Sequence, residues 1–400
     1  MNRSAEMLAP DQAVALMLDR VAPVGQEDVE WHRATNRVLA QAIVSDRDSP
    51  PADVSAMDGY AVRLRDVGGV GIDVAGEILP GEPATQLPAG KTMRIVTGAL
   101  VPVGAEAVVR REDVVVEKED HIELPPGFTP RAGENIRRRG ENAPAGTEVL
   151  PSGALLGPAA ISAVAASGAA RLRVHRRVRL GILVTGSELH PVESLPRPWE
   201  IRDSNGPQLA ALAAGCPWIE LIRRENVIDV ESRLEEQLAA LLQDCDAILL
   251  TGGVSMGSHD FVPAVVRSLG ATVLFHRLPI RPGKPIMGAI SPAGQPVLAL
   301  PGNPVSVLTT ACRFAGPVFR RLAGMREVLP HRPMVLLDKS PTSLALWRFP
   351  AIGMISDGRA RLLPSRGSGD IVGIAQSDGF VEIPPDAAGD GPYTLWRWEW

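Results

Sequence analysis

Glycine, acidic and basic residues gather at the ends of apolar runs in the second half of the chain. The stretch Asp246–Asp260 reads Asp-Ala-Ile-Leu-Leu-Thr-Gly-Gly-Val-Ser-Met-Gly-Ser-His-Asp. Glycines permit positive φ angles and a close backbone approach, so the turn at Gly252, Gly253 and Ser255 can present N–H groups to an anion such as phosphate. Helical spacing from Phe261 to Leu269 places this turn at a helix N-terminus, which also favours an anion. The alternative is a plain structural turn.

Four acids, Asp58, Glu188, Asp229 and Asp260, could supply the oxygen ligands that Mg²⁺ prefers. Mg²⁺ is commonly held by one or two carboxylates and bridges to phosphates. For any single acid, the alternative is a helix cap or a surface position.

The segment Arg277-Leu278-Pro279-Ile280-Arg281-Pro282-Gly283-Lys284-Pro285 carries three cations in a frame stiffened by proline, which suits a polyanion. A solvated surface loop is the alternative. A second basic segment, residues 135–142, could also clamp phosphate. His259 has no histidine or cysteine at ligand spacing, which favours an ordinary loop histidine, and Ser255 lacks the Gly-x-Ser-x-Gly pattern of a hydrolase.

Parallel βαβ units are predicted from Arg173 onward, because apolar runs alternate with longer helical patterns. Ligands bind outside the carboxyl ends of parallel strands. Glu188, Asp260 and the turn Pro301-Gly302-Asn303-Pro304 should therefore face one crevice. The predicted strands are 178–185, 246–251 and 298–300, and the predicted helices are 208–215, 234–242 and 305–321.

The remaining segments are predicted from caps, breakers and periodicity. Asp11 is expected to cap a first helix that carries Val14, Met17, Leu18 and Val21. We expect a second amphipathic segment at residues 30–44, short strands and turns at 53–148, a short helix at 159–170 that ends near Gly168, and short strands after Gly324.

Composition restricts the class of protein. The chain has 400 residues, 45% hydrophobic content and a net charge of −5, which favours a globular protein of several domains and gives no global preference for nucleic acid or membranes. Three scattered cysteines argue against a zinc site or a disulfide framework and fit a reducing cytoplasm. The sequence shows neither a secretory leader nor an apolar stretch of about 18 residues, so no membrane span is expected.

Several motifs together resemble the molybdopterin molybdenumtransferase family, which includes bacterial MoeA and the gephyrin E domain. The resemblance spans nearly the whole chain and implies insertion of molybdate into adenylylated molybdopterin, with release of AMP and dependence on Mg²⁺. The motifs are Ser55-Ala56-Met57-Asp58-Gly59-Tyr60-Ala61, residues 94–99, 135–141 and 251–257, Thr185-Gly186, Asp203-Ser204-Asn205, Pro282-Gly283-Lys284-Pro285 and Pro301-Gly302-Asn303-Pro304.

The implied fold is multidomain α/β plus β. It comprises an N-terminal helix (1–22) on the α/β domain, an elongated linker domain (23–48 and 146–172), a protruding β-rich domain (49–145), a three-layer, MogA-like α/β domain (173–325) and a C-terminal β barrel (326–400).

The resemblance also implies site residues and partners. Catalytic roles fall to Asp58, Thr97, Glu188, Asp229 and Asp260, with Glu188 and Asp229 as metal ligands; substrate binding falls to Gly252, Gly253, Ser255, Arg277, Arg281, Lys284, Pro301 and Pro304. A cytoplasmic homodimer with shared active sites is implied, as is contact with the molybdopterin adenylyltransferase.

The sequence departs from the family pattern at several positions. Ser187 and Asn142 stand where acids are common, Arg202 stands where an aromatic is common, and Arg277 and Arg281 stand where lysine is common. Adenylyl transfer to molybdopterin, a divergent paralogue and a non-catalytic scaffold are therefore alternatives, and the choice between molybdate and tungstate stays open.

Overall fold

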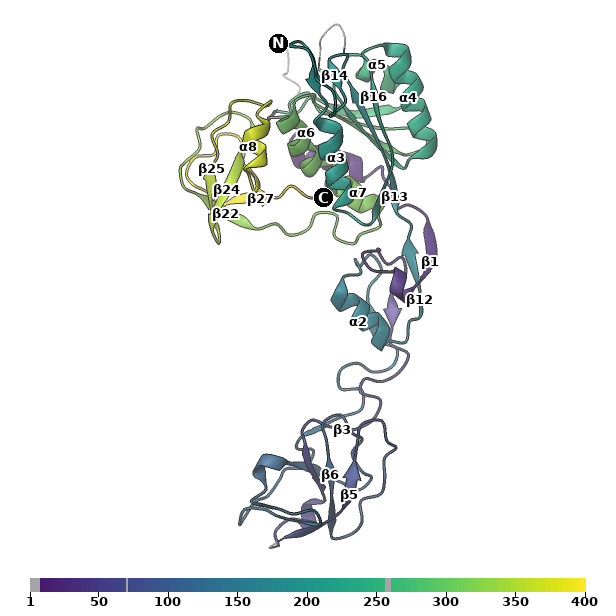
Figure 1. Cartoon of the computed structure of the whole chain (residues 1–400), viewed down its shortest axis with the longest axis vertical. Helices are drawn as coiled ribbons and strands as arrows, with labels where there is room; N and C mark the ends of the chain where they lie inside the picture. The colour runs from purple at the N-terminus through teal and green to yellow at the C-terminus, as the bar shows by residue number, and fades with distance from the viewer. Residues whose placement is uncertain (1–7, 70, 256–259) are drawn as a thin grey trace, which may run out of the picture. The chain divides into compact units, whose positions relative to one another are not determined.

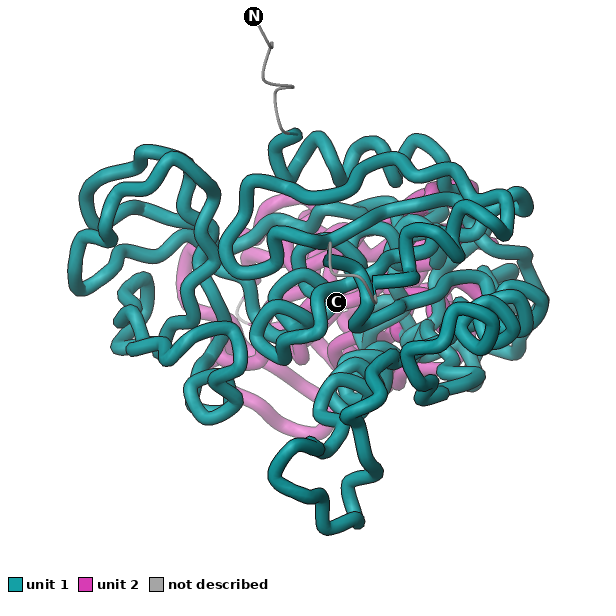
Figure 2. The backbone as a smooth tube through the Cα atoms, turned by 90° about the horizontal axis from the view of Figure 1, so that it is seen from above, with its two compact units in different colours: residues 1–41, 152–161, 171–400 teal, residues 42–151, 162–170 magenta. Residues whose placement is uncertain are grey.

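The computed structural model describes residues 8–69, 71–255 and 260–400, which form two compact units (Figure 2). Unit 1 comprises the chain up to Gln41 together with Ser152–Ile161 and Arg171–Trp400. Unit 2 comprises Ala42–Pro151 and Ser162–Ala170. The finer division into five segments stays a prediction. No helix in the described part of the chain is both long and apolar enough to cross a membrane.

Unit 1 contains a six-stranded sheet in the order β16-β13-β17-β21-β20-β18. The first four strands are parallel, and β20 and β18 follow as antiparallel neighbours. Every residue of β17 and β21 is buried, as expected for strands that helices cover on both faces. The strands are β13 (Val178–Thr185), β16 (Ile219–Val227), β17 (Ala247–Thr251), β18 (Thr272–His276), β20 (Met287–Ile290) and β21 (Pro296–Leu300).

Helices pack on both faces of this sheet, because successive side chains of β13 enter different cores. Ile182 and Val184 pack with α1, α3, α6 and α7, whereas Leu183 packs with α4 and α5. Figure 1 shows α4 and α5 together on one side of the sheet. The helices are α1 (Pro10–Leu18), α3 (Asn205–Ala214), α4 (Glu231–Asp244), α5 (Val262–Ser268), α6 (Pro304–Thr310) and α7 (Gly316–Leu322), with a π-helical turn at Ala311–Ala315 between the last two.

The first helix is present, but its predicted cap is wrong. Ala9 is the N-cap and Pro10 takes the first helical position, which places Asp11 inside the first turn. The Asp11 carboxylate instead accepts a hydrogen bond from Arg313. Val14 and Met17 are buried as predicted.

The segment 30–44 has little regular structure. It begins with a 3₁₀ turn, η1 (Trp31–Arg33), after β1 (Gln26–Glu30), which pairs with β12 (Arg171–His175). Val38 and Leu39 are buried as predicted. Each forms an isolated backbone bridge to a segment that is distant in the sequence. The predicted helix at 159–170 is α2 (Pro158–Ala166), which ends before Gly168 at a φ of 73°, the left-handed geometry of a glycine cap.

Unit 2 is built from short strands and turns, as predicted for residues 53–148. Its six-stranded sheet has the order β7-β4-β6-β5-β9-β8. Two smaller pairs, β2 with β11 and β3 with β10, complete it. The elements are β2 (Ile43–Val44), β3 (Val54–Ser55), β4 (Gly59–Val62), η2 (Leu64–Asp66), β5 (Ile72–Ile78), β6 (Lys91–Ile95), β7 (Ala107–Arg110), η3 (Arg111–Asp113), β8 (Val116–Glu117), β9 (His121–Glu123), β10 (Ile136–Arg137) and β11 (Glu148–Leu150).

The C-terminal part of unit 1 is a closed five-stranded barrel in the order β22-β25-β24-β26-β27, which confirms the predicted barrel. Its interior is apolar and includes Val335, Ile352 and Val381. The elements are β22 (Met334–Leu337), β24 (Ala351–Ser356), β25 (Arg359–Leu362), α8 (Ile371–Ala375), β26 (Gly379–Glu382) and β27 (Tyr393–Trp396); β23 (Trp347–Arg348) pairs with β19 (Ile280–Arg281) beside it.

Candidate active site

A cavity of about 390 Å³ lies at the carboxyl ends of β13, β17 and β21 in unit 1, where the sequence predicted a crevice. Three acids and one arginine carry the formal charges among its described lining residues. The predicted residues in the lining are Glu188, Asp229, Gly252, Gly253, Ser255, Asp260, Pro301 and Pro304, joined by Thr185, Gly186, Leu189, Ile201, Arg202, Ser204, Asn205, Val254, Pro285, Gly302 and Asn303.

The Gly252-Gly253 turn has the positive φ angles that the sequence indicated, 93° and 57°. A Cβ atom on Gly252 would lie 2.2 Å from the backbone oxygen of Thr185, so any larger residue would collide with the end of β13. The turn therefore exposes backbone rather than side chains to the cavity. The next four residues of the predicted anion turn, 256–259, which include Met256 and His259, lie outside the described residues.

Asp229 follows β16 and connects it to the turn after β13. One carboxylate oxygen accepts a hydrogen bond from the Thr185 hydroxyl, and the other accepts one from the Ser187 N–H at 3.0 Å. The Ser187 hydroxyl in turn accepts from the Asp229 N–H at 3.1 Å. Ser187, which stands where an acid is common, thus helps to fix the acid across the cavity.

Glu188 reaches the same part of the cavity from the turn after β13. A Cβ atom on Gly186 would lie 2.8 Å from the Glu188 Oε2, so the glycine leaves room for this carboxylate. Asp260 lines the cavity two residues before α5 begins. These positions bring three of the four predicted acids together.

The described side chains of the cavity fit a metal site that substrate and water complete. No cluster of three or more His, Cys, Asp or Glu side chains able to hold a metal ion occurs among the described residues. Mg²⁺ held by one or two carboxylates, with water and substrate phosphates completing the octahedron, fits.

Asn205 is a structural centre of the site that sequence reasoning left without a role. Its side-chain amide donates to the Thr251 hydroxyl at 3.1 Å and to the Gly302 carbonyl at 2.7 Å. The Thr251 hydroxyl donates to the Pro301 carbonyl at 3.0 Å. These bonds tie the Pro301–Pro304 turn to the end of β17. In the sequence, the Asp203-Ser204-Asn205 motif at the start of α3 was the feature that could have indicated this role.

The basic loop is not part of the cavity lining, apart from Pro285. Arg277, Arg281 and Lys284 have exposed side chains. The loop itself is well defined, because the Leu278 N–H donates to the Lys284 carbonyl at 3.0 Å. A substrate longer than the cavity would be needed to contact both the acids and these cations.

Asp58 and Thr97 lie together in unit 2. One Asp58 oxygen accepts from the Thr97 N–H at 2.7 Å and from its hydroxyl at 2.8 Å. These bonds, led by the backbone one, hold the pKa of the Asp58 carboxyl below its usual range. Both side chains are exposed, so the pair presents a fixed carboxylate at the surface of unit 2.

The arginines of the segment 135–142 already have acidic partners. Arg138 pairs with Asp53 at 2.6 Å, and Arg139 pairs with Asp48. Hydrogen bonds from the Ala145 N–H and from Arg139 lower the pKa of Asp48. Burial acts to raise the pKa of Asp53, but hydrogen bonds from the Arg139 N–H and from Arg138 outweigh it and lower this pKa. The pairs give this segment a structural role within unit 2, which weakens its interpretation as a phosphate clamp.

The three cysteines lie outside the described lining of the cavity. Cys216, Cys245 and Cys312 are unpaired and buried. Burial raises the pKa of their thiols, to about 11, 11 and 12 respectively, which makes them poor nucleophiles.

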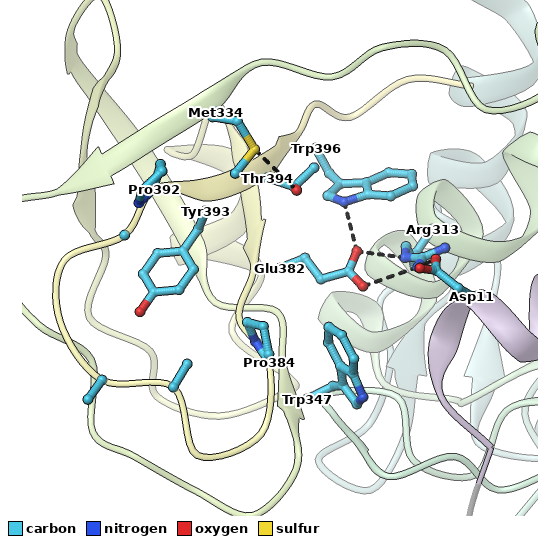
Figure 3. Close-up of a pocket in the computed structure, with 13 residues that line it drawn as sticks. Asp11, Arg313, Met334, Trp347, Glu382, Pro384, Pro392, Tyr393, Thr394 and Trp396 are labelled. Carbon is cyan, nitrogen blue, oxygen red and sulfur yellow. Dashed lines mark hydrogen bonds and ion pairs between the residues drawn. The ribbon is translucent and has the colours of Figure 1, made fainter.

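A second cavity, of about 440 Å³, lies beside the barrel (Figure 3). Its described lining contains none of the predicted site residues. It is bordered by Trp347, Trp396 and Glu382 of the barrel region and by Arg313 and Asp11 from the helical layer. Glu382 and Arg313 form a buried ion pair there.

Comparisons with known proteins agree with this architecture. Residues 8–168 match the family described as MoeA N-terminal region (domain I and II), and residues 181–321 match the one described as Probable molybdopterin binding domain. A molybdopterin molybdenumtransferase from Nostoc is 38% identical over 75% of this chain and 70% of its own length. One from Synechococcus elongatus is 34% identical over 94% and 96%.

Solved structures show the same likeness. The molybdopterin biosynthesis MoeA protein of Pyrococcus horikoshii superimposes with a TM-score of 0.82 and 28% identity, over 98% of this chain and 99% of that one. Sequence and fold agree over nearly the full length of the chain. The chain belongs to the molybdopterin molybdenumtransferase family.

Proposed function

We propose that this chain inserts molybdate into adenylylated molybdopterin and releases AMP. The observation that carries the proposal is the cavity, which joins a glycine turn suited to phosphate to carboxylates at neighbouring strand ends. Such a site suits a substrate with a phosphate linkage that must be held in place while it is cleaved.

The backbone, the acidic residues and the basic residues of the site would each bind a different part of the substrate or the metal ion. The backbone at Gly252 and Gly253 would approach a phosphate closely, and Glu188 with Asp229 would hold Mg²⁺. Mg²⁺ bound there would withdraw negative charge from the departing AMP. Arg281 and Lys284, which have exposed side chains and no ion-pair partner among the described residues, would bind molybdate or a substrate phosphate beyond the cavity.

The test is molybdate-dependent release of AMP by the purified chain from adenylylated molybdopterin. We expect release that requires both the oxyanion and Mg²⁺, and parallel reactions with tungstate would decide which oxyanion is preferred. Formation of adenylylated molybdopterin from ATP and molybdopterin would instead favour an adenylyltransferase. Absence of both reactions would favour a scaffold.

We also propose a homodimer in which each active site uses unit 2 of one subunit and unit 1 of the other. The support is that Asp58 and Thr97 belong to unit 2, whereas the residues around the cavity belong to unit 1. In a twofold dimer both sites would then be equivalent.

This arrangement predicts complementation. Asp58→Ala and Glu188→Ala should each be inactive alone. After subunit exchange in an equal mixture, half of the dimers are heterodimers with one intact site, so activity should return to about a quarter of wild type. A mixture of Asp58→Ala with Thr97→Ala is the matched control and should stay inactive, because both changes lie in unit 2. Exchanged subunits that regain no activity in the first mixture would contradict the shared site.

A further inference from the structure

Arg202 is held in place at the wall of the cavity by its backbone. β15 (Ile201–Arg202) pairs in parallel with β14 (Leu189–His190), and the Ile201 N–H donates to the Glu188 carbonyl at 2.9 Å. The next residue, Asp203, is buried and accepts from the Gly206 N–H at 2.9 Å at the start of α3. Arg202 is thus anchored on both sides, next to the predicted metal ligand Glu188.

The Arg202 guanidinium is only partly used by the protein. Its Nε donates to the Ser194 carbonyl at 2.9 Å, and no carboxylate among the described residues lies within ion-pair distance of it. The loop that supplies this carbonyl is itself fixed, because Glu200 accepts from the Arg197 N–H at 2.9 Å and lies 3.4 Å from His190. One edge of the guanidinium is therefore oriented, and its two terminal nitrogens can donate to a ligand.

Arg202 partly offsets the negative charge of the cavity lining. Glu188, Asp229 and Asp260 all line the cavity, and Arg202 is the one cation in its described lining. Three carboxylates repel a phosphate ester unless positive charge offsets them. An oriented arginine supplies two parallel N–H donors that match two phosphate oxygens.

We infer that Arg202 binds a phosphate group of the substrate. This inference rests on the proposed function. In adenylylated molybdopterin a pyrophosphate joins the two halves, with one phosphate on the adenosine side and the other on the pterin side. In either case Arg202 is a substrate-binding residue that replaces the aromatic side chain common at this position.

Direct binding of ligands that represent parts of the substrate tests the inference without turnover. AMP, adenosine and molybdopterin would be titrated into wild type, Arg202→Gln, Arg202→Lys and Arg197→Gln by calorimetry at low salt. Arg197→Gln is the matched control, because it removes the same charge from the same loop but Arg197 does not line the cavity.

We expect Arg202→Gln to weaken binding of AMP or of molybdopterin by roughly tenfold or more, consistent with loss of a bidentate charged contact. Arg202→Lys should fall between it and wild type, and Arg197→Gln should match wild type. Adenosine, which has no phosphate, should bind all four proteins equally. The ligand that loses affinity identifies which end of the substrate Arg202 holds.

Two results would overturn the inference: unchanged affinity of Arg202→Gln for both phosphate ligands, or an equal loss in Arg197→Gln. Unchanged melting temperatures would separate a lost contact from a disturbed loop, and Arg202→Lys serves where the glutamine variant fails to fold. If wild type releases no AMP on addition of molybdate, yet AMP binding depends on Arg202, the proposed reaction fails while the phosphate site stands.

Discussion

Glu188→Gln is expected to lower molybdate-dependent AMP release by roughly 100-fold or more, because it removes a charged ligand from a cation that acts on the leaving group. The fold should be unaffected. Glu188 lines the cavity and forms no ion pair with a described residue, so its charge is available to a ligand. We therefore expect a wild-type melting temperature with a large loss in kcat.

Asp229→Asn should lose activity as well, but with a measurable loss of stability. Both carboxylate oxygens of Asp229 accept hydrogen bonds, from Thr185 and from the Ser187 N–H. An amide can keep the bond from the Ser187 N–H through its oxygen and donate its NH₂ to the Thr185 hydroxyl oxygen, so two bonds to a charged acceptor become neutral ones. We expect the unfolding free energy to fall by about 1–2 kcal/mol, because hydrogen bonds to a charged group are the stronger ones.

Glu193→Gln is the matched control for both variants, since Glu193 is exposed in the loop after β14 and does not line the cavity. It should keep full activity. Excess Mg²⁺ should partly restore the two cavity variants if they have lost metal affinity. Wild-type turnover by both Glu188→Gln and Asp229→Asn would remove the metal assignment.

The elements that carry the site were predictable because they follow simple patterns. β13 was predicted with its observed bounds, Val178–Thr185, and the acid-bearing and glycine-bearing turns do meet at one edge of a parallel sheet. Buried parallel strands are apolar on both faces, and their carboxyl ends share one edge, so residue order alone locates the crevice.

What the sequence could not provide were contacts between segments distant along the chain. The amide of Asn205 bridges to Gly302, 97 residues away, and no local pattern encodes that bond. The exposure of the basic loop also depends on tertiary structure. Its prolines predict that the loop is stiff, but the path of the neighbouring backbone decides whether its cations reach the cavity. Local rules also placed Asp11 as a cap, whereas Pro10 and a distant arginine determine its role.

The second large effect is expected from the ion pair that Arg313 forms with Glu382. Only 2% of the Arg313 side chain is exposed, and it donates to both oxygens of Glu382, at 2.7 and 3.1 Å. Glu382 also accepts from the Trp396 indole N–H at 3.0 Å, and the guanidinium carbon lies 4.8 Å from the centre of a Trp396 ring. Figure 3 shows this cluster between the barrel and the helical layer.

Replacing Glu382 leaves the buried Arg313 guanidinium with one described acidic partner, Asp11, whose side chain is 82% exposed and compensates the charge only weakly. We therefore expect Glu382→Gln to destabilise the chain by about 3–5 kcal/mol, measured by urea unfolding with tryptophan fluorescence. Glu236→Gln is the matched control. Glu236 pairs with Arg233 at 3.0 Å, but both side chains are exposed, and surface pairs contribute little. Its unfolding midpoint should be nearly that of wild type.

A double-mutant cycle separates the ion pair from ordinary packing. Arg313→Met keeps the apolar stem of the arginine and removes its charge, so combined with Glu382→Gln it leaves no buried formal charge at this position. The double variant should therefore be much less destabilised than the sum of the two single variants, by about 1–3 kcal/mol of coupling energy. If the two effects simply add, Arg313 and Glu382 are not energetically coupled. The loss in Glu382→Gln would then come from its contact with Trp396 instead.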